Sequence, residues 1–131
     1  MSRNLAREIP AGLLSDVPFK YFKRSEFDCS ETGENEMDSE FIARLDLLRG
    51  ACGFPFKVNS GYRSLQHSIE AAKDQPGMHT TGRASDIAVS NGEQRYLLVR
   101  RAIEHGFAGI GVAKGYIHLD ARLGPKVMWT Y

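Results

Sequence analysis

Two short segments of this chain alternate polar and apolar residues in a way that strongly constrains the fold. Residues 84–89 read Ala-Ser-Asp-Ile-Ala-Val, and residues 116–120 read Tyr-Ile-His-Leu-Asp. Successive side chains of a β-strand point to opposite faces of the sheet. The alternation therefore predicts two strands, with Asp86 between two alanines on one face and with His118 and Asp120 sharing a face. If these strands are neighbours, the three polar side chains converge on one spot.

A second histidine, His79, lies in the turn before the first of these strands and can reach the same spot. Histidines and carboxylates are the usual ligands of a catalytic zinc ion, which takes three of them and leaves one position open. The methyl groups on either side of Asp86 leave room for an ion above the sheet. Single histidines and aspartates are more often ordinary exposed residues. The pattern alone therefore leaves two interpretations, a zinc site and a polar sheet surface.

The chain is expected to form a single domain over residues 1–131, which is long enough to bury a core. The fold class is α+β, with a small, mostly antiparallel sheet that carries helices on one face and the polar cluster on the other. Residues 1–18 are expected to be an irregular N-terminal arm, and the tail after residue 124 is assigned no element. The other predicted elements are a helix from 38 or 39 to 50–53, a strand at 56–59, a short helix at 65–73, a helix at 93–105 and a strand at 107–112.

Charge and composition argue against several functional classes. Seventeen basic and sixteen acidic residues give a formal net charge of +1, so neither a nucleic acid nor a membrane partner is expected. No apolar run reaches the roughly 18 residues of a membrane span. The N-terminus lacks a secretory signal, so synthesis in the cytoplasm is expected. Cys29 and Cys52 form no Cys-x-x-Cys pair and are expected to be free thiols.

Four motifs, in order along the chain, carry a resemblance to a known family. They are Ser60-Gly-Tyr-Arg-Ser, His-x-x-Gly-x-Ala-x-Asp-Ile from His79, Gly-Phe-x-Gly-Ile-Gly from Gly106, and Ile-His-Leu-Asp ending at Asp120. Together they resemble the zinc D-alanyl-D-alanine carboxypeptidase family, whose fold is shared with the Hedgehog signalling domain. The resemblance covers about residues 22–131. The His-x-Asp ending, followed by Gly-Pro and a tryptophan, is similar to the branch found in bacteriophage lysis proteins and bacterial murein peptidases.

The resemblance implies roles for particular residues. The implied zinc ligands are His79, Asp86 and His118. Arg63 is implied to bind a substrate carboxylate or to polarise the scissile carbonyl, since its planar fork suits an oxyanion. The structural alternative for Arg63 is a surface ion pair with an acid. Ser60 and His67 are further candidates for substrate contact, and an ordinary exposed histidine is the alternative for His67.

The chain departs from the family where many members carry their catalytic carboxylate. That Glu or Asp lies three residues before the last histidine ligand, and here the position holds Gly115. Asp120 is the best substitute because it shares a strand face with His118. It is expected either to accept the catalytic proton or to orient a histidine ligand through a hydrogen bond. Both roles stay open at this point.

The implied function is that of a zinc-dependent peptidoglycan peptidase, either a D,D-carboxypeptidase or an endopeptidase. It would hydrolyse a bond that contains a D-amino acid in the stem peptides of the cell wall. A monomer is expected, and a phage-encoded protein of this kind would reach the wall during host lysis or as part of a virion. The alternative is a catalytically inactive zinc fold that binds the wall. Gly115 favours that alternative, whereas Arg63 and the three intact ligand positions oppose it.

Overall fold

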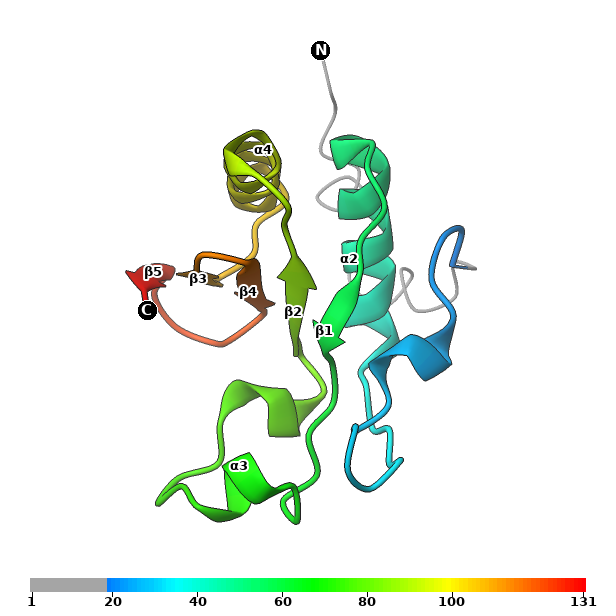
Figure 1. The fold of residues 1–131 in the computed structure, drawn as a ribbon, viewed down its shortest axis with the longest axis vertical. Coiled ribbons are helices and arrows are strands. Elements are labelled where there is room, and N and C mark those ends of the chain that lie inside the picture. The colour runs from blue at the N-terminus through cyan, green and yellow to red at the C-terminus, as the bar shows by residue number, and fades with distance from the viewer. Residues whose placement is uncertain (1–18) are drawn as a thin grey trace.

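In the computed structural model of the protein, the described residues are 19–131, so the arm predicted for residues 1–18 lies outside them. Figure 1 shows a sheet with helices on it, and α, β and η denote α-helices, strands and 3-10 helices. The elements in chain order are η2 (Arg24–Phe27), α2 (Ser39–Cys52), β1 (Val58–Ser60), α3 (Ser68–Ala71), η3 (Met78–Thr81), β2 (Ala84–Ala88), α4 (Gly92–Glu104), β3 (Gly109–Val112), β4 (Tyr116–Asp120) and β5 (Val127–Thr130).

The five strands form one sheet in the order β1-β2-β4-β3-β5. The pairs β1/β2, β2/β4 and β3/β4 are antiparallel, and β3/β5 is parallel. The predicted α+β class with a mostly antiparallel sheet is confirmed. Strand β5 was not predicted from the sequence, because the chain turns back after β4 and crosses to the far side of β3 before it pairs. No local hairpin pattern in the sequence indicates such a strand.

The register of β2 against β4 separates the polar from the apolar residues. Ile87 is paired with Ile117, whereas Asp86 is paired with His118. The two isoleucines are completely buried. Because a slip by one residue would move each set to the opposite face, burial of the isoleucines also fixes the polar residues on the other face.

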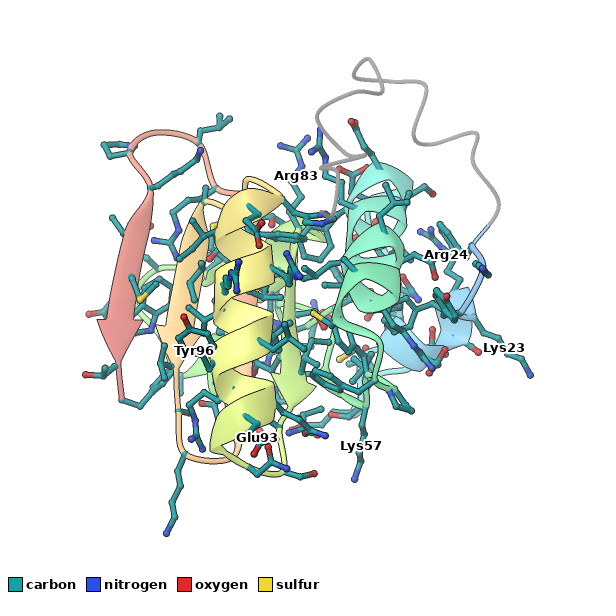
Figure 2. The ribbon with its side chains drawn as sticks, turned by 90° about the horizontal axis from the view of Figure 1, so that it is seen from above. Lys23, Arg24, Lys57, Arg83, Glu93 and Tyr96 are labelled. Carbon is teal, nitrogen blue, oxygen red and sulfur yellow. The ribbon has the colours of Figure 1, made fainter. Side chains whose placement is uncertain are left out.

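The two long helices, α2 and α4, lie side by side over the apolar face of the sheet (Figures 1 and 2). The buried apolar side chains that these helices share with the sheet are Phe41, Ile42, Leu45, Leu48, Ile87, Leu98, Ala102, Ile117 and Leu119. Complete burial of one such large side chain contributes about 1.5–3 kcal/mol. This core anchors the central strands and so supports the polar residues on the opposite face.

The helix ends follow the signals in the sequence. The side chain of Asp38 accepts a hydrogen bond from the backbone N–H of Glu40 at the start of α2. Gly53 ends α2 with a left-handed conformation, φ 75°. Asn91 caps α4 by accepting from the N–H of Gln94. No helix among residues 19–131 is long and apolar enough to cross a membrane.

Candidate metal centre

The candidate metal centre is built on a row of residues that crosses four adjacent strands. Asp86 on β2 is paired with His118 on β4, which is paired with Gly111 on β3, which is paired with Trp129 on β5. A Cβ atom at Gly111 would lie 2.7 Å from Nε1 of Trp129. The glycine therefore lets the indole lie across β3, where its ring centroid is 5.3 Å from that of His118.

His79 completes the cluster from η3, the short helix before β2. Its Nε2 lies 3.2 Å from Oδ1 of Asp86, and Nδ1 of His118 lies 3.0 Å from the same oxygen. One potential ligand atom from each of these residues lies within 4.8 Å of the others, and all three residues are buried. The structure thus brings together the three residues that the resemblance implied.

The hydrogen-bond partners of the two histidines determine which ring nitrogens can bind a metal. Nδ1 of His79 is 2.8 Å from the carbonyl oxygen of Gly61, which can only accept, so Nδ1 carries a proton and Nε2 is the nitrogen left for a metal. Nε2 of His118 is 2.7 Å from Oδ2 of Asp120, which leaves Nδ1 free in the same way. Both of these nitrogens face Oδ1 of Asp86, and a bound metal would replace the proton through which either ring donates to that oxygen. Two imidazoles oriented by oxygen acceptors, together with one carboxylate, fit the requirements of a catalytic zinc ion.

Both carboxylates in this cluster are ionised at neutral pH. Burial opposes ionisation of Asp86, but hydrogen bonds from His118 and His79 outweigh it and hold the pKa of Asp86 well below its usual range. Burial likewise opposes ionisation of Asp120. Hydrogen bonds from His118 and Arg122 outweigh that burial, so the pKa of Asp120 also lies well below its usual range.

Asp120 lies behind His118 rather than in the open part of the site. Its side chain is fully buried, and Arg122 holds it with Nε 2.9 Å from Oδ1 and Nη2 2.7 Å from Oδ2. A Cβ at the paired residue Gly109 would lie 2.2 Å from Oδ1 of Asp120, so the carboxylate fits only beside a glycine. Asp120 therefore reaches the ligand cluster through the ring of His118.

A cavity of about 320 Å³ opens beside the ligand cluster. Its lining includes Ile69, Lys73 and Met78 from the segment that runs from α3 to η3, and Tyr116, Trp129 and Tyr131 from β4 and the C-terminal end. Arg63 and Arg122 also line it. Among the described residues that line this cavity, Asp86 is the only carboxylate. The cavity is open and is lined by aromatic and basic side chains beside the candidate ligand cluster. It therefore suits a substrate that is partly apolar and carries negative charge.

Arg63 enters the cavity with its guanidinium already held by protein groups. Nε donates to Oγ of Ser60 at 3.1 Å and Nη1 to Oε2 of Glu70 at 3.2 Å, while Nη2 lies 3.6 Å from Oδ2 of Asp86. Ser60, a predicted substrate contact, does not line the cavity and instead supports Arg63. Glu70 was not singled out in the sequence, because an acid on a short helix carries no signal of its own.

His67, the other predicted substrate contact, is held outside the cavity. Its Nδ1 accepts the backbone N–H of Ile69 and so caps α3. Its Nε2 lies 3.3 Å from Oε2 of Glu31. Because both ring nitrogens have protein partners and the residue does not line the cavity, its position does not support a substrate contact. The same cap explains why α3 begins at Ser68, later than predicted.

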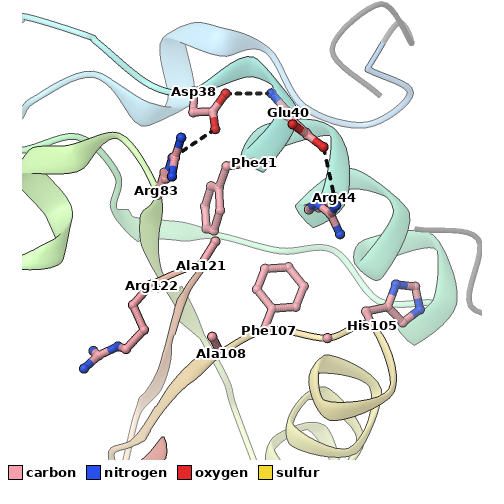
Figure 3. A pocket seen from close by; sticks show the side chains of 11 residues that line it. Asp38, Glu40, Phe41, Arg44, Arg83, His105, Phe107, Ala108, Ala121 and Arg122 are labelled. Carbon is pink, nitrogen blue, oxygen red and sulfur yellow. Dashed lines mark hydrogen bonds and ion pairs between the residues drawn. The ribbon is translucent and has the colours of Figure 1, made fainter. Parts of the chain in front are cut away.

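A second cavity, of about 370 Å³, lies near the start of α2 and is shown in Figure 3. Four of its charged residues form two ion pairs: Asp38 with Arg83 at 3.3 Å and Glu40 with Arg44 at 3.4 Å. Arg122 lines both cavities. The His-Asp-His cluster opens only into the smaller one, so the smaller cavity is the candidate active site.

Two buried histidines and a carboxylate beside an arginine and an open cavity are the features of a metal-dependent hydrolase. The sequence model of the Peptidase M15 family matches residues 20–120, so the chain belongs to this family. It is therefore a zinc metallopeptidase, and the resemblance drawn from the four motifs is confirmed. No match to the chain was found among curated proteins. The family match supports peptidoglycan as the general substrate.

Proposed function

We propose that this peptidase hydrolyses a D-amino-acid-containing amide bond in peptidoglycan stem peptides, with His79, Asp86 and His118 as its zinc ligands. Family membership supports the reaction in general. The observation that carries the assignment is the convergence of two histidine ring nitrogens and one carboxylate oxygen within 4.8 Å, beside an open cavity.

Arg63 is the group proposed to bind substrate. When bound, zinc supplies Lewis-acid polarisation of the scissile carbonyl and lowers the pKa of water. An arginine carries five N–H groups, and two of those in Arg63 donate to Ser60 and Glu70. Those that remain on the terminal nitrogens can donate to a substrate carboxylate or to the oxyanion that develops during hydrolysis.

Asp120 is proposed to position His118 rather than to accept the catalytic proton. A general base must lie within hydrogen-bond reach of the proton that it removes, directly or through one water. Asp120 is fully buried, does not line the cavity, and has both oxygens engaged by His118 and Arg122. Its charge keeps the proton on Nε2 of His118 and leaves Nδ1 free as a ligand.

The proposed setting is lysis of a bacterial host, or entry through its wall, by a phage-encoded monomer. The His-x-Asp ending of β4 followed by Gly-Pro and Trp129 supports this setting, because it is similar to that branch of the family. The proposed reaction is either that of a carboxypeptidase or that of an endopeptidase. The absence of a carboxylate at Gly115 favours a second candidate, a wall-binding domain without catalytic activity.

Digestion of purified peptidoglycan with and without a zinc chelator tests the proposal. Mass spectrometry should show products that form only without chelator. Free D-alanine identifies a carboxypeptidase, and opened cross-links identify an endopeptidase. A Glu104→Gln variant, altered on the outer surface of α4 away from the cavity, should match the wild type. Binding to peptidoglycan without any released product would instead establish the wall-binding domain.

A further inference from the structure

Glu70 is a buried carboxylate on α3 for which the mechanism above has no role. Its side chain has no exposed surface. Oε2 accepts from Nη1 of Arg63 at 3.2 Å and from Nζ of Lys73 at 3.1 Å, and Oε1 accepts from the backbone N–H of Gly77 at 2.8 Å. A buried charge is tolerated when it is paired and hydrogen-bonded in this way.

These contacts join three segments that meet at the active site. Arg63 follows β1, Glu70 lies on α3, and Gly77 is the residue that precedes η3, which carries His79. A Cβ at Gly77 would lie 3.2 Å from Oε1 of Glu70 and 2.8 Å from Nζ of Lys73, so the close approach depends on a glycine. One carboxylate thus holds both the arginine and the start of the segment that bears a proposed ligand.

The geometry of Arg63 shows what the Glu70 contact contributes. A free arginine side chain has several rotatable bonds and loses rotamer entropy when it is fixed. Ser60 holds Nε, whereas Nη2 is 3.6 Å from Asp86, longer than a hydrogen bond. The bond from Nη1 to Glu70 is therefore the closest restraint on the terminal nitrogens that face the cavity.

We propose that Glu70 is a positioning residue for the reaction, acting through Arg63. It holds the guanidinium plane beside the ligand cluster before substrate arrives, so that the fork need not be ordered during binding. This inference rests on the proposed function of the site, in which Arg63 contacts substrate.

A double-mutant cycle on the zinc-loaded enzyme tests the inference. Glu70→Gln should keep the zinc content and lower kcat/KM by about 10²-fold, the cost of misplacing a catalytic group by about 1 Å. In an Arg63→Ala background the same change should lower kcat/KM by less than about threefold, because the group that Glu70 positions is gone. Glu104→Gln, which removes a carboxylate paired with Arg101 on α4, serves as the matched control.

Equal losses in both backgrounds would overturn the inference, since they would mean that Glu70 acts independently of Arg63. If Glu70→Gln does not fold, Glu70→Asp replaces it, and its smaller loss must likewise vanish in the Arg63→Ala background. A wild-type protein that holds zinc but cleaves no stem peptide overturns the proposed function, and this inference with it. An active wild type with an unaffected Glu70→Gln variant overturns the role of Glu70 alone.

Discussion

Oδ2 of Asp120 lies 2.7 Å from Nε2 of His118, across the ring from the nitrogen that faces Asp86. The imidazole is therefore held between two carboxylates, one on each ring nitrogen. Burial lowers the pKa of His118, but its hydrogen bonds to Asp120 and Asp86 outweigh burial and raise it. The ring is strongly fixed in orientation, which is what a metal ligand requires.

The Asp120→Asn variant separates the two roles that the sequence left open for this residue. If Asp120 positions His118, zinc affinity should fall by about 10–100-fold, and activity should partly return with excess zinc. Zinc affinity by chelator competition and hydrolysis rate should be measured on the same preparation. Unchanged affinity with a rate lowered by about 10²–10⁴-fold would instead identify Asp120 as the proton acceptor.

The wild-type protein should contain close to one zinc ion per chain when it is prepared without added metal. The His118→Ala variant should lose most of it, because the variant lacks one of the three converging ligand atoms. Elemental analysis of the two purified proteins is the measurement. Substitution of His67, which caps α3 outside the cavity, is the matched control and should leave zinc content unchanged. Normal zinc in His118→Ala would remove His118 from the ligand set.

The Arg63→Lys variant should fold and bind zinc normally but lose most of its activity. An ammonium group cannot reproduce the fork that contacts Ser60 and Glu70 while it presents further N–H groups to substrate. Circular dichroism measures folding, elemental analysis measures zinc content, and the release of stem-peptide products measures activity. Full activity would show that Arg63 makes no specific contact with substrate, and loss of folding would favour a structural role.

Much of this fold follows from patterns that are local in the sequence. The alternation around Asp86 and His118 predicts which residues share a face, because the period of a strand is two. The cap at Asp38 and the glycine at Gly53 predict the ends of α2. The apolar stripe of α2 predicts its buried face. Each of these signals depends only on neighbours along one element.

Other features depend on which elements pack together in the fold. Local sequence patterns do not predict that packing. The pairing of Trp129 with Gly111 depends on the β3/β5 order. The role of Glu70 depends on α3 lying against Arg63, and Ser60 and His67 matched a motif without revealing which groups they contact. Spacing and the family resemblance therefore pointed to the proposed ligands and to Asp120, but not to Glu70, which holds Arg63.

The glycine at position 109 should be as important to the metal centre as Asp120 itself. A Cβ there would lie 2.2 Å from Oδ1 of Asp120, so Gly109→Ala must displace the carboxylate from His118. We expect zinc affinity to weaken about as much as in Asp120→Asn, by about 10–100-fold. Gly115→Ala is the matched control, because a Cβ at Gly115 meets no atom within 4 Å. Zinc titration of both alanine variants tests this prediction. Equal zinc affinities would contradict the packing of Gly109 against Asp120.

The last prediction concerns acid stability and Glu70. Burial raises the pKa of this carboxyl, but hydrogen bonds from Gly77, Lys73 and Arg63 outweigh burial and lower the pKa below its ordinary value of 4.5. A group whose pKa is lower in the folded state stabilises the protein above its unfolded pKa, and this contribution disappears as pH falls through the folded pKa. The difference in unfolding free energy between wild type and Glu70→Gln should therefore be constant near neutrality and shrink below about pH 4. Urea unfolding of the metal-free proteins from pH 7 to pH 3 measures it. A difference that stays constant over this range would show that ionisation of Glu70 contributes nothing to folding.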